Sequence, residues 1–460
     1  MIVLLAALLS GTMFYLSQGL ADVWALAWFA PASLLWLAYG DTPRWQVLLA
    51  SLTAFAAGQM YLVQCYWGRI PPSIIAPLAL ALGVAFAVAV LFSGEALRRG
   101  SPWVALVAFP AVWTALEYGI DLISPHGSYG ALGYAEVSFP AGIQVAALFG
   151  VYAVTFLLCL SANAVALVLR RWAAAGAVGV GVCAAALIFG VLRLEAPMGP
   201  RVSVAALSNV DSRNLESRER TLASEEAASE SYASYIGRLN AVRVVAIPEG
   251  ALGMQVSDEQ AVLAPLAAAA RVQHALVLAG TSTPVPVQNR AFAFLPDGGV
   301  EAYAKRHPLL PFETEVPGRE PGLLGGGYAT QICKDMDFPR TVRDTAAHGV
   351  RLMIVPADDF GRDGWIHARI AIMRGVENGF AVLRSAFDGL ETISDAQGRI
   401  LASASTERAG MVAVLAEVPL GPGPTLYTRI GDVFPWLCAA LSVLIGVRAL
   451  GLERRVSHDR

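Results

Sequence analysis

Long apolar stretches fill the N-terminal part of the chain and return once near its C-terminus. Each stretch is long enough to cross a bilayer as a helix. The seven N-terminal stretches lie near residues 2–20, 22–40, 47–66, 75–94, 103–121, 141–168 and 173–192, and the eighth lies near 433–451. This pattern predicts an α-helical membrane bundle of about eight spans.

The region between the seventh and eighth stretches has a different pattern. Polar helical segments alternate there with short runs rich in β-branched residues, which is typical of an α/β domain. Strands are predicted over 202–208, 242–248, 275–281, 291–296, 351–356 and 380–385, and helices over 216–238, 258–271 and 365–378. We therefore expect a membrane domain with seven helices at 1–195, an α/β domain at 196–422, and a last membrane helix with a cytoplasmic tail at 423–460.

The arginines of the short loops predict the orientation in the membrane, because cytoplasmic loops carry an excess of basic residues. With a cytoplasmic N-terminus, the loops on the outer side hold only Arg69, with Arg193 just after the seventh stretch. The inner loops and the tail hold Arg44, Arg98, Arg99, Arg170, Arg171, Arg454 and Arg455. The α/β domain should then lie outside the cytoplasm.

Composition supports a membrane protein and narrows the partners. The 460 residues are 56% hydrophobic and 15% charged, whereas soluble domains have about 25% charged residues. The formal net charge of −3 gives no reason to expect a nucleic-acid partner. The histidines and cysteines show no metal-ligand spacing, so we expect no metal site.

Cys333 differs from the other four cysteines, which all lie in apolar stretches. It follows a run ending in Ala-Thr-Gln-Ile (329–332), which predicts a short buried strand, and it precedes a helical segment that begins after Pro339. A thiol at a strand-to-helix turn can face a cleft and act as a nucleophile. The alternative is a small buried apolar residue, since free cysteine is commonly buried.

Two other polar residues follow predicted strands, Glu249 after 242–248 and Lys305 after a short run that ends at Ala304. Active sites of α/β sheets gather at strand ends, so these residues could converge on Cys333. The carboxylate would accept the thiol proton, and the ammonium would favour the thiolate and an oxyanion. A solvated loop charge is the simpler interpretation of each residue taken alone.

Short motifs around these residues resemble the nitrilase superfamily of carbon–nitrogen hydrolases. They are Pro-Glu-Gly at 248–250, Tyr-Ala-Lys at 303–305, Ile-Cys-Lys-Asp-Met-Asp-Phe-Pro at 332–339 and Arg-Gly-Val-Glu-Asn-Gly at 374–379. The resemblance implies a catalytic triad of Glu249, Lys305 and Cys333. It also implies a four-layer αββα sandwich for the α/β domain.

The membrane part is similar to that of the apolipoprotein N-acyltransferase family. The similarity rests on 110–119, on the run from Gly133 through Gln144 to Val151, and on Thr-Leu-Tyr-Thr-Arg-Ile-Gly-Asp at 425–432. It implies transfer of an acyl chain from a phospholipid, through a thioester, to the N-terminal amine of a diacylglyceryl lipoprotein. It further implies no cofactor, and a bacterial cytoplasmic (inner) membrane with the catalytic domain on the periplasmic side.

The chain departs from the family pattern beside the nucleophile, where Cys-Tyr-Glu becomes Cys333-Lys334-Asp335. Both new residues are possible accessory residues. The family's Pro-Phe-Gly-Glu is replaced by Pro-Phe-Glu-Thr-Glu at 311–315. An accessory glutamate role could therefore fall to Glu313 or Glu315. These changes leave open a membrane-tethered amidase, or an acyltransferase for another amine. A transport or sensory protein with an inactive domain is a third possibility, for which Glu117 within an apolar stretch would be the sign.

Overall fold

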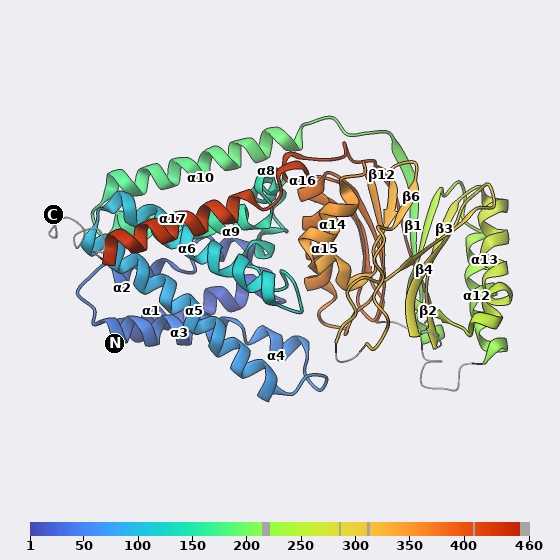
Figure 1. The fold of residues 1–460 in the computed structure, drawn as a ribbon, viewed down its shortest axis with the longest axis horizontal. Coiled ribbons are helices and arrows are strands. Elements are labelled where there is room, and N and C mark those ends of the chain that lie inside the picture. The colour runs from blue at the N-terminus through green and yellow to red at the C-terminus, as the bar shows by residue number, and fades with distance from the viewer. Residues whose placement is uncertain (214–220, 285–286, 311–312, 408–409, 451–460) are drawn as a thin grey trace, which may run out of the picture. The chain divides into compact units, whose positions relative to one another are not determined.

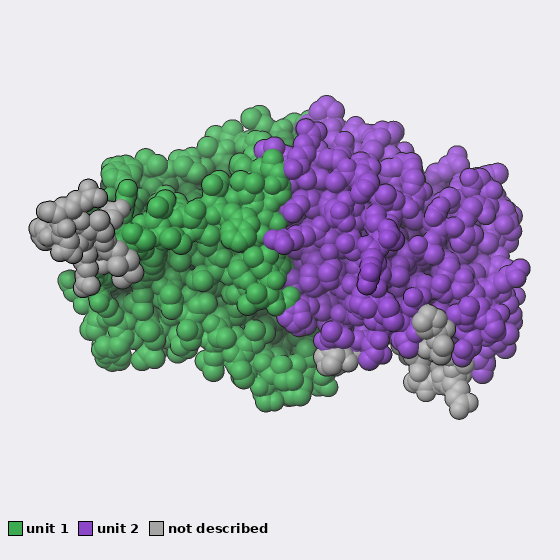
Figure 2. Space-filling model, in the orientation of Figure 1, with its two compact units in different colours: residues 1–124, 128–195, 430–460 green, residues 125–127, 196–429 purple. Residues whose placement is uncertain are grey.

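The chain was analysed as a computed structural model, which describes residues 1–213, 221–284, 287–310, 313–407 and 410–450. Two compact units divide it (Figure 2). The first comprises residues 1–124, 128–195 and 430–460, and the second comprises residues 125–127 and 196–429.

The first unit is helical (Figure 1). Its longer helices are α1 (Ile2–Gln18), α3 (Arg44–Gly58), α5 (Pro72–Arg99), α6 (Pro102–Ile123), α9 (Val151–Leu169), α10 (Ala173–Leu194) and α17 (Val433–Leu450). Its shorter elements are η1 (Trp24–Leu26), α2 (Ala32–Ala38), α4 (Tyr61–Cys65), η2 (Leu132–Glu136), α7 (Pro140–Ile143) and α8 (Ala146–Phe149).

Within the described residues, five helical segments are long and apolar enough to cross a membrane. They are Arg44–Cys65, Pro72–Arg99, Pro102–Ile123, Val151–Leu169 and Ala173–Leu194. Three shorter apolar helices accompany them at Ile2–Gln18, Pro140–Phe149 and Val433–Arg448. The chain therefore carries a helical apolar unit of the kind that the hydrophobic pattern predicts.

Two of the predicted membrane helices are interrupted. The helix predicted over 22–40 is present only as η1 and α2, because Pro31 stands at the N-cap of α2 and has no N–H to donate to a preceding turn. The helix predicted over 141–168 is broken at Gly150, which has φ 77° and separates α8 from α9. Hydrophobicity alone did not reveal either break.

The second unit contains two six-stranded sheets. The first sheet has the order β12-β1-β2-β3-β4-β5. Its strands are β1 (Arg201–Asn209), β2 (Val244–Gly253), β3 (Leu276–Pro284), β4 (Val287–Phe294), β5 (Val300–Ala304) and β12 (Met411–Pro419). Strands β1, β2 and β3 are parallel, and the outer strands pair antiparallel.

The second sheet has the order β11-β10-β9-β8-β7-β6. Its strands are β6 (Leu323–Gly325), β7 (Tyr328–Thr330), β8 (Leu352–Asp358), β9 (Ala381–Phe387), β10 (Leu390–Ser394) and β11 (Ile400–Ser405). Strands β7, β8 and β9 are parallel, and the others pair antiparallel. Parallel strands in both sheets bring several strand ends to one edge, which is where sites form in such sheets.

Helices cover the outer face of each sheet. Helices α12 (Leu222–Ile236) and α13 (Glu259–Gln273) pack on the first sheet through a core that includes Tyr232, Leu266 and Ile247. Helices α14 (Pro339–Ala346) and α15 (Gly364–Asn378) cover the second sheet around Val342, Met353 and Ala371. The remaining short elements are α11 (Val210–Arg213), η4 (Val256–Asp258), η5 (Cys333–Asp337) and α16 (Leu426–Ile430).

The two sheets face each other across an apolar core that includes Val204, Leu278, Ile354 and Leu383. The order of layers is therefore helix, sheet, sheet, helix (Figure 1), which confirms the predicted αββα sandwich. The helix predicted over 216–238 begins in residues that the structure does not describe, and its described part is α12.

Candidate active site

Cys333 lies at a sharp turn between β7 and η5. Its φ of 44° is in the left-handed region, which is uncommon for a residue with a side chain and marks local backbone strain. The side chain is half-buried, and its Sγ lies 3.7 Å from the backbone oxygen of Asp358, which accepts the S–H. The predicted strand-to-helix placement is confirmed, with a short 3₁₀ turn before α14.

Glu249 lies within β2 rather than after it, because β2 continues to Gly253 through an irregularity between Ile247 and Leu252. The neighbouring strand makes room for this bend at Gly280, where a Cβ would lie 2.2 Å from the backbone oxygen of Pro248. The carboxyl group is buried, with 6% of the residue exposed. The bend thus places Glu249 inside the sandwich, toward the site.

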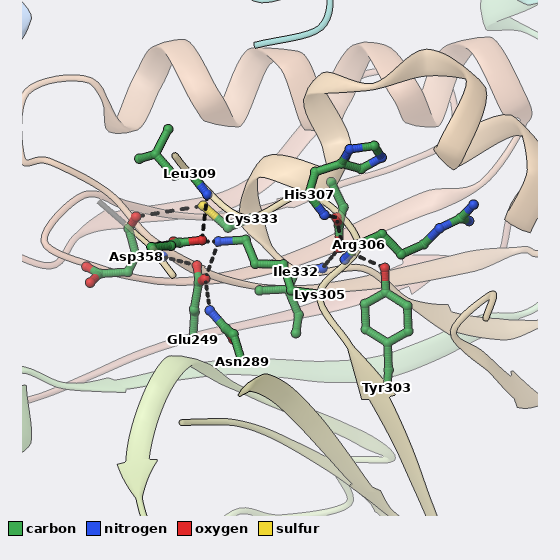
Figure 3. A network of polar contacts seen from close by, with 12 residues as sticks. Glu249, Asn289, Tyr303, Lys305, Arg306, His307, Leu309, Ile332, Cys333 and Asp358 are labelled. Carbon is green, nitrogen blue, oxygen red and sulfur yellow. Dashed lines mark hydrogen bonds and ion pairs between the residues drawn. The ribbon is translucent and has the colours of Figure 1, made fainter. Parts of the chain in front are cut away.

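Lys305 follows β5 and is 1% exposed. Its Nζ donates to Glu249 Oε1 at 2.6 Å and to Glu313 Oε1 at 2.7 Å (Figure 3). Burial alone would lower the pKa of Lys305, but the neighbouring Glu249, Cys333 and Glu313 outweigh it and hold the pKa well above its usual value. The ammonium is therefore charged throughout the physiological pH range.

Three donors converge on the Glu249 carboxylate. Besides Lys305, the Asn289 side-chain amide donates to Oε1 at 2.5 Å, and the Asp358 backbone N–H donates to Oε2 at 3.2 Å. Burial raises the pKa of Glu249, while Lys305 opposes this rise. A carboxyl group with a raised pKa and fixed orientation suits transfer of a proton to and from the thiol.

The thiol of Cys333 is set among opposing charges. Burial raises its pKa well above the usual value, and the Glu249 carboxylate adds to that rise, whereas Lys305 lowers it. The resting sulfur is therefore a thiol, and the structure places a base and an ammonium near it. The three residues that the sequence singled out thus come together from β2, the end of β5 and the end of β7.

Glu313, not Glu315, is joined to this cluster. Its second carboxylate oxygen accepts from the Leu309 backbone N–H at 2.7 Å, so the carboxylate that contacts Lys305 is held in place. Within the described residues, Glu315 makes no hydrogen bond to Glu249, Lys305 or Cys333. The geometry favours Glu313 for the accessory role that the sequence left open.

Asp335 ties the Lys305 segment to the nucleophile turn. Its two carboxylate oxygens accept from Tyr303 Oη at 2.7 Å and from the backbone N–H groups of Arg306, His307 and Ile332 at 2.8–3.1 Å (Figure 3). Burial raises the pKa of Asp335, and these donors oppose the rise. Asp335 therefore acts as a structural link between the two sheets.

Lys334 is 4% exposed and makes no hydrogen bond or ion pair within the described part of the chain. Burial lowers its pKa, and the charge of Lys305 lowers it further, while Asp337 raises it.

His367 lies between two carboxylates, since it contacts both Asp337 and Asp363. These two carboxylates outweigh the effect of burial and raise the pKa of His367 to about 10.

Sequence reasoning missed two contributors, the Asn289 side chain and the Asp358 peptide. Asn289 is a polar residue in a β4 segment that is otherwise buried toward its end, and it is only 7% exposed. The burial of this amide is visible only in the structure, so the sequence offered no signal for it. The described residues contain no group of three or more His, Cys, Asp or Glu placed to hold a metal ion.

The αββα sandwich and its Glu–Lys–Cys cluster indicate the class of protein. A carbon–nitrogen hydrolase model matches residues 202–421, so the second unit is a nitrilase-superfamily domain attached to an apolar helical unit. Residues 10–164 match the apolipoprotein N-acyltransferase N-terminal domain model. The chain belongs to the apolipoprotein N-acyltransferase family.

Relatives match over nearly the whole chain. The apolipoprotein N-acyltransferase of Geobacter metallireducens is 27% identical, with 99% of this chain and 96% of that protein covered. The apolipoprotein N-acyltransferase of Azotobacter vinelandii is also 27% identical, with the same coverage. Among solved structures, an amidase from Nesterenkonia sp. is 20% identical, with a TM-score of 0.40 over 49% of this chain and 93% of that one.

Proposed function

We propose that this protein moves an acyl chain from a phospholipid, through a thioester on Cys333, to the N-terminal amine of a lipoprotein diacylglyceryl-cysteine. The observation that carries the proposal is the buried contact of Lys305 with Glu249 beside Cys333, in a chain that also carries membrane-spanning helices. A hydrolase acting on soluble substrates would not need those helices. Membership of the apolipoprotein N-acyltransferase family supports the same substrates.

The first half-reaction forms the thioester. Glu249 accepts the proton of the Cys333 thiol, and the thiolate attacks the ester carbonyl of the phospholipid. The Lys305 ammonium, with backbone N–H groups, stabilises the oxyanion that develops. The carbon–oxygen bond of the ester then breaks, and the departing lysophospholipid alkoxide takes the proton from Glu249.

The second half-reaction uses the same groups in reverse. The acceptor amine attacks the thioester carbonyl, and Glu249 takes a proton from its nitrogen. The carbon–sulfur bond breaks as the amide forms, and the proton returns to the Cys333 sulfur. Lys305 stabilises the departing thiolate, as it stabilised the one that attacked. This cycle needs neither a metal nor a cofactor.

The eight-span arrangement and the domain boundaries remain part of the proposal. The eight proposed crossings are the five long apolar helices, the shorter α1 and α17, and the interrupted segment at 22–40 that contains η1 and α2. We propose a membrane domain at 1–195, the catalytic domain at 196–422 and a last span with its tail at 423–460. The loop arginines support a catalytic domain on the periplasmic side of a bacterial inner membrane. A reporter fused after residue 200 should be active only outside the cytoplasm and one fused after Arg460 only inside, and the opposite result at either site would overturn the arrangement.

The decisive experiment follows a radiolabelled acyl chain. Purified enzyme incubated with a phospholipid labelled in both acyl chains should acquire a label on Cys333 that hydroxylamine releases. Adding a peptide that begins with diacylglyceryl-cysteine should move the label to the peptide, while the same peptide with an acetylated amine should not receive it. A Cys333→Ala variant, which has lost the nucleophile, is the control.

The alternatives predict other outcomes of that experiment. A membrane-tethered amidase would release the label as a free fatty acid or hydrolyse a simple amide faster than it acylates the peptide. A transport or sensory protein with an inactive domain would never acquire label on Cys333. Either result would overturn the proposed function.

A further inference from the structure

The end of β8 contacts both the nucleophile and its base. The Asp358 backbone oxygen accepts from the Cys333 thiol at 3.7 Å, and the Asp358 N–H donates to Glu249 Oε2 at 3.2 Å (Figure 3). One peptide segment therefore touches both groups between which the proton must pass. Its position fixes how the thiol and the carboxylate face each other.

Asp359, the next residue, anchors this segment through a buried ion pair. Its carboxylate accepts from both terminal nitrogens of Arg384 on β9, with Arg384 Nη1 at 3.0 Å from Oδ2 and Nη2 bonded to Oδ1. Asp359 is 1% exposed and Arg384 2% exposed. A two-pronged contact of this kind fixes orientation as well as distance.

The turn between β9 and β10 completes the anchor. The Asp359 N–H donates to the Phe387 oxygen at 3.0 Å, and Arg384 Nη1 donates to the Leu390 oxygen at 2.9 Å. Gly389 leaves the necessary space, since a Cβ there would lie 1.9 Å from Asp359 Oδ2. The carboxylate is thus enclosed on several sides and cannot turn away from Arg384.

Both members of the pair also act on the charge of the thiol. The Asp359 carboxylate raises the pKa of Cys333 and the Arg384 guanidinium lowers it. The other charged groups that act on Cys333 are Glu249, Lys305 and Lys334, and Asp363 also acts on Arg384. In the intact pair the two charges act on the sulfur in opposite directions, whereas either member alone is an uncompensated buried charge.

We propose that Arg384 and Asp359 are positioning residues for acyl transfer, which hold the Asp358 peptide between thiol and base and keep the charge beside the thiol balanced. The inference rests on the proposed role of Cys333 as nucleophile. It adds a function for two buried residues that make no hydrogen bond to the Cys333 sulfur within the described residues.

The charge balance predicts opposite effects from the two single variants. Arg384→Gln leaves the Asp359 carboxylate unopposed, so the thiolate is disfavoured and the pKa of the thiol rises. Asp359→Asn leaves the guanidinium unopposed, so the pKa of the thiol falls. The double variant Asp359→Asn/Arg384→Gln is neutral and should return most of the way to the wild-type value. A residue needed only for folding would not give shifts of opposite sign.

The test uses the full-length protein in detergent and needs no lipid substrate. Cys333 is alkylated with iodoacetamide across a pH series, and the modified peptide is quantified by mass spectrometry. At a fixed pH below the midpoint, Arg384→Gln should alkylate at least about tenfold more slowly than wild type, which equals a rise of about one unit in the midpoint. Arg384→Lys, which keeps the charge, should stay near the wild-type midpoint.

Arg290→Gln is the matched control, because Arg290 is also ion-paired, to Glu259 at 2.6 Å, but acts elsewhere in the same unit. Its midpoint should equal that of wild type. Shifts of equal sign in the two single variants, or no shift in either, would overturn the proposal. If Arg384→Gln does not fold, Asp359→Asn alone still decides, since only a lowered midpoint agrees with the proposal.

Acyl-transfer kinetics separate this inference from the proposed function. In the single variants, the rate of thioester formation should fall while the KM for the phospholipid stays near the wild-type value, because both side chains are almost fully buried and present no surface to the donor. If the wild-type enzyme transfers no acyl chain but the alkylation midpoints still move in opposite directions, the proposed function fails and the positioning role stands.

Discussion

Replacing Lys305 by alanine removes a cation that contacts both Glu249 and Glu313. In the intact protein its Nζ lies 2.6 Å from Glu249 and 2.7 Å from Glu313, and the residue is 1% exposed. Without it, two acidic groups share a buried space with no ammonium between them. Burial raises the pKa of Glu249 and the Lys305 charge opposes that rise, so removing Lys305 raises the pKa further and makes Glu249 a less available base for the Cys333 proton.

Two losses combine in the Lys305→Ala variant. Removal of one oxyanion donor typically lowers a rate by about 10²–10³, and loss of a general base lowers it by about 10²–10⁴. Because both effects come from one residue they do not simply multiply, and we expect thioester formation to slow by at least about 10³. The residual rate should also need a higher pH, since its rising limb follows the raised pKa of Glu249.

Single-turnover labelling of Cys333 with a radiolabelled phospholipid measures this directly, with hydroxylamine release as the readout. Lys305→Arg should not restore the rate, because a planar guanidinium does not fit the place of a compact ammonium that is 1% exposed. A Lys305→Ala enzyme that forms the acyl-cysteine within about tenfold of the wild-type rate would refute the reasoning, as that loss is too small for either role.

Three further outcomes follow from the same geometry. Glu313→Gln should lower the rate of thioester formation by at least about tenfold, because it removes a carboxylate that holds the Lys305 ammonium, whereas Glu315→Gln should leave the single-turnover rate near wild type. Lys334→Ala should keep most of the activity, since Lys334 makes no hydrogen bond within the described residues; a loss as large as that of Lys305→Ala, measured in the same assay, would assign it the oxyanion role instead. The pKa of His367 is raised to about 10 from an ordinary value near 6.5, so its ion pairs stabilise the fold fully below about pH 6.5 and lose that effect as the pH rises through about 10. His367→Gln should therefore lower the thermal unfolding midpoint at pH 6 more than at pH 10.5, and an equal drop at both would contradict the charge assignment.

The convergence of Glu249, Lys305 and Cys333 followed from the sequence more directly than the bounds of the membrane helices did, for a physical reason. Glu249, Lys305 and Cys333 each stand at or near a strand end, so topology alone brings them toward one edge. Hydrophobicity, by contrast, does not register a missing N–H at Pro31 or a left-handed residue at Gly150, and these two residues break helices that the pattern predicts as continuous.

Other features depend on side-chain direction and lay beyond any linear pattern. The choice of Glu313 over Glu315 depends on which carboxylate turns toward Lys305, and the two residues lie only two positions apart in the chain. Asn289 lies within β4, where nothing in the sequence distinguishes its side chain. Asp358 contributes its backbone N–H and oxygen, and these groups do not depend on which residue stands there. Contacts of this kind carry no compositional signature.

The pairing of β1 with β12 has a consequence for how such a chain can arise. Arg201, at the start of the first strand, lies opposite Pro419, at the end of the last one. The catalytic unit therefore begins and ends side by side at one edge of one sheet. A domain whose two ends lie close together can be inserted into a loop of another protein without distorting that protein. Hybrid enzymes could accordingly be made by exchanging the catalytic domain between related membrane proteins. The exchange points would be the residues that flank β1 and β12.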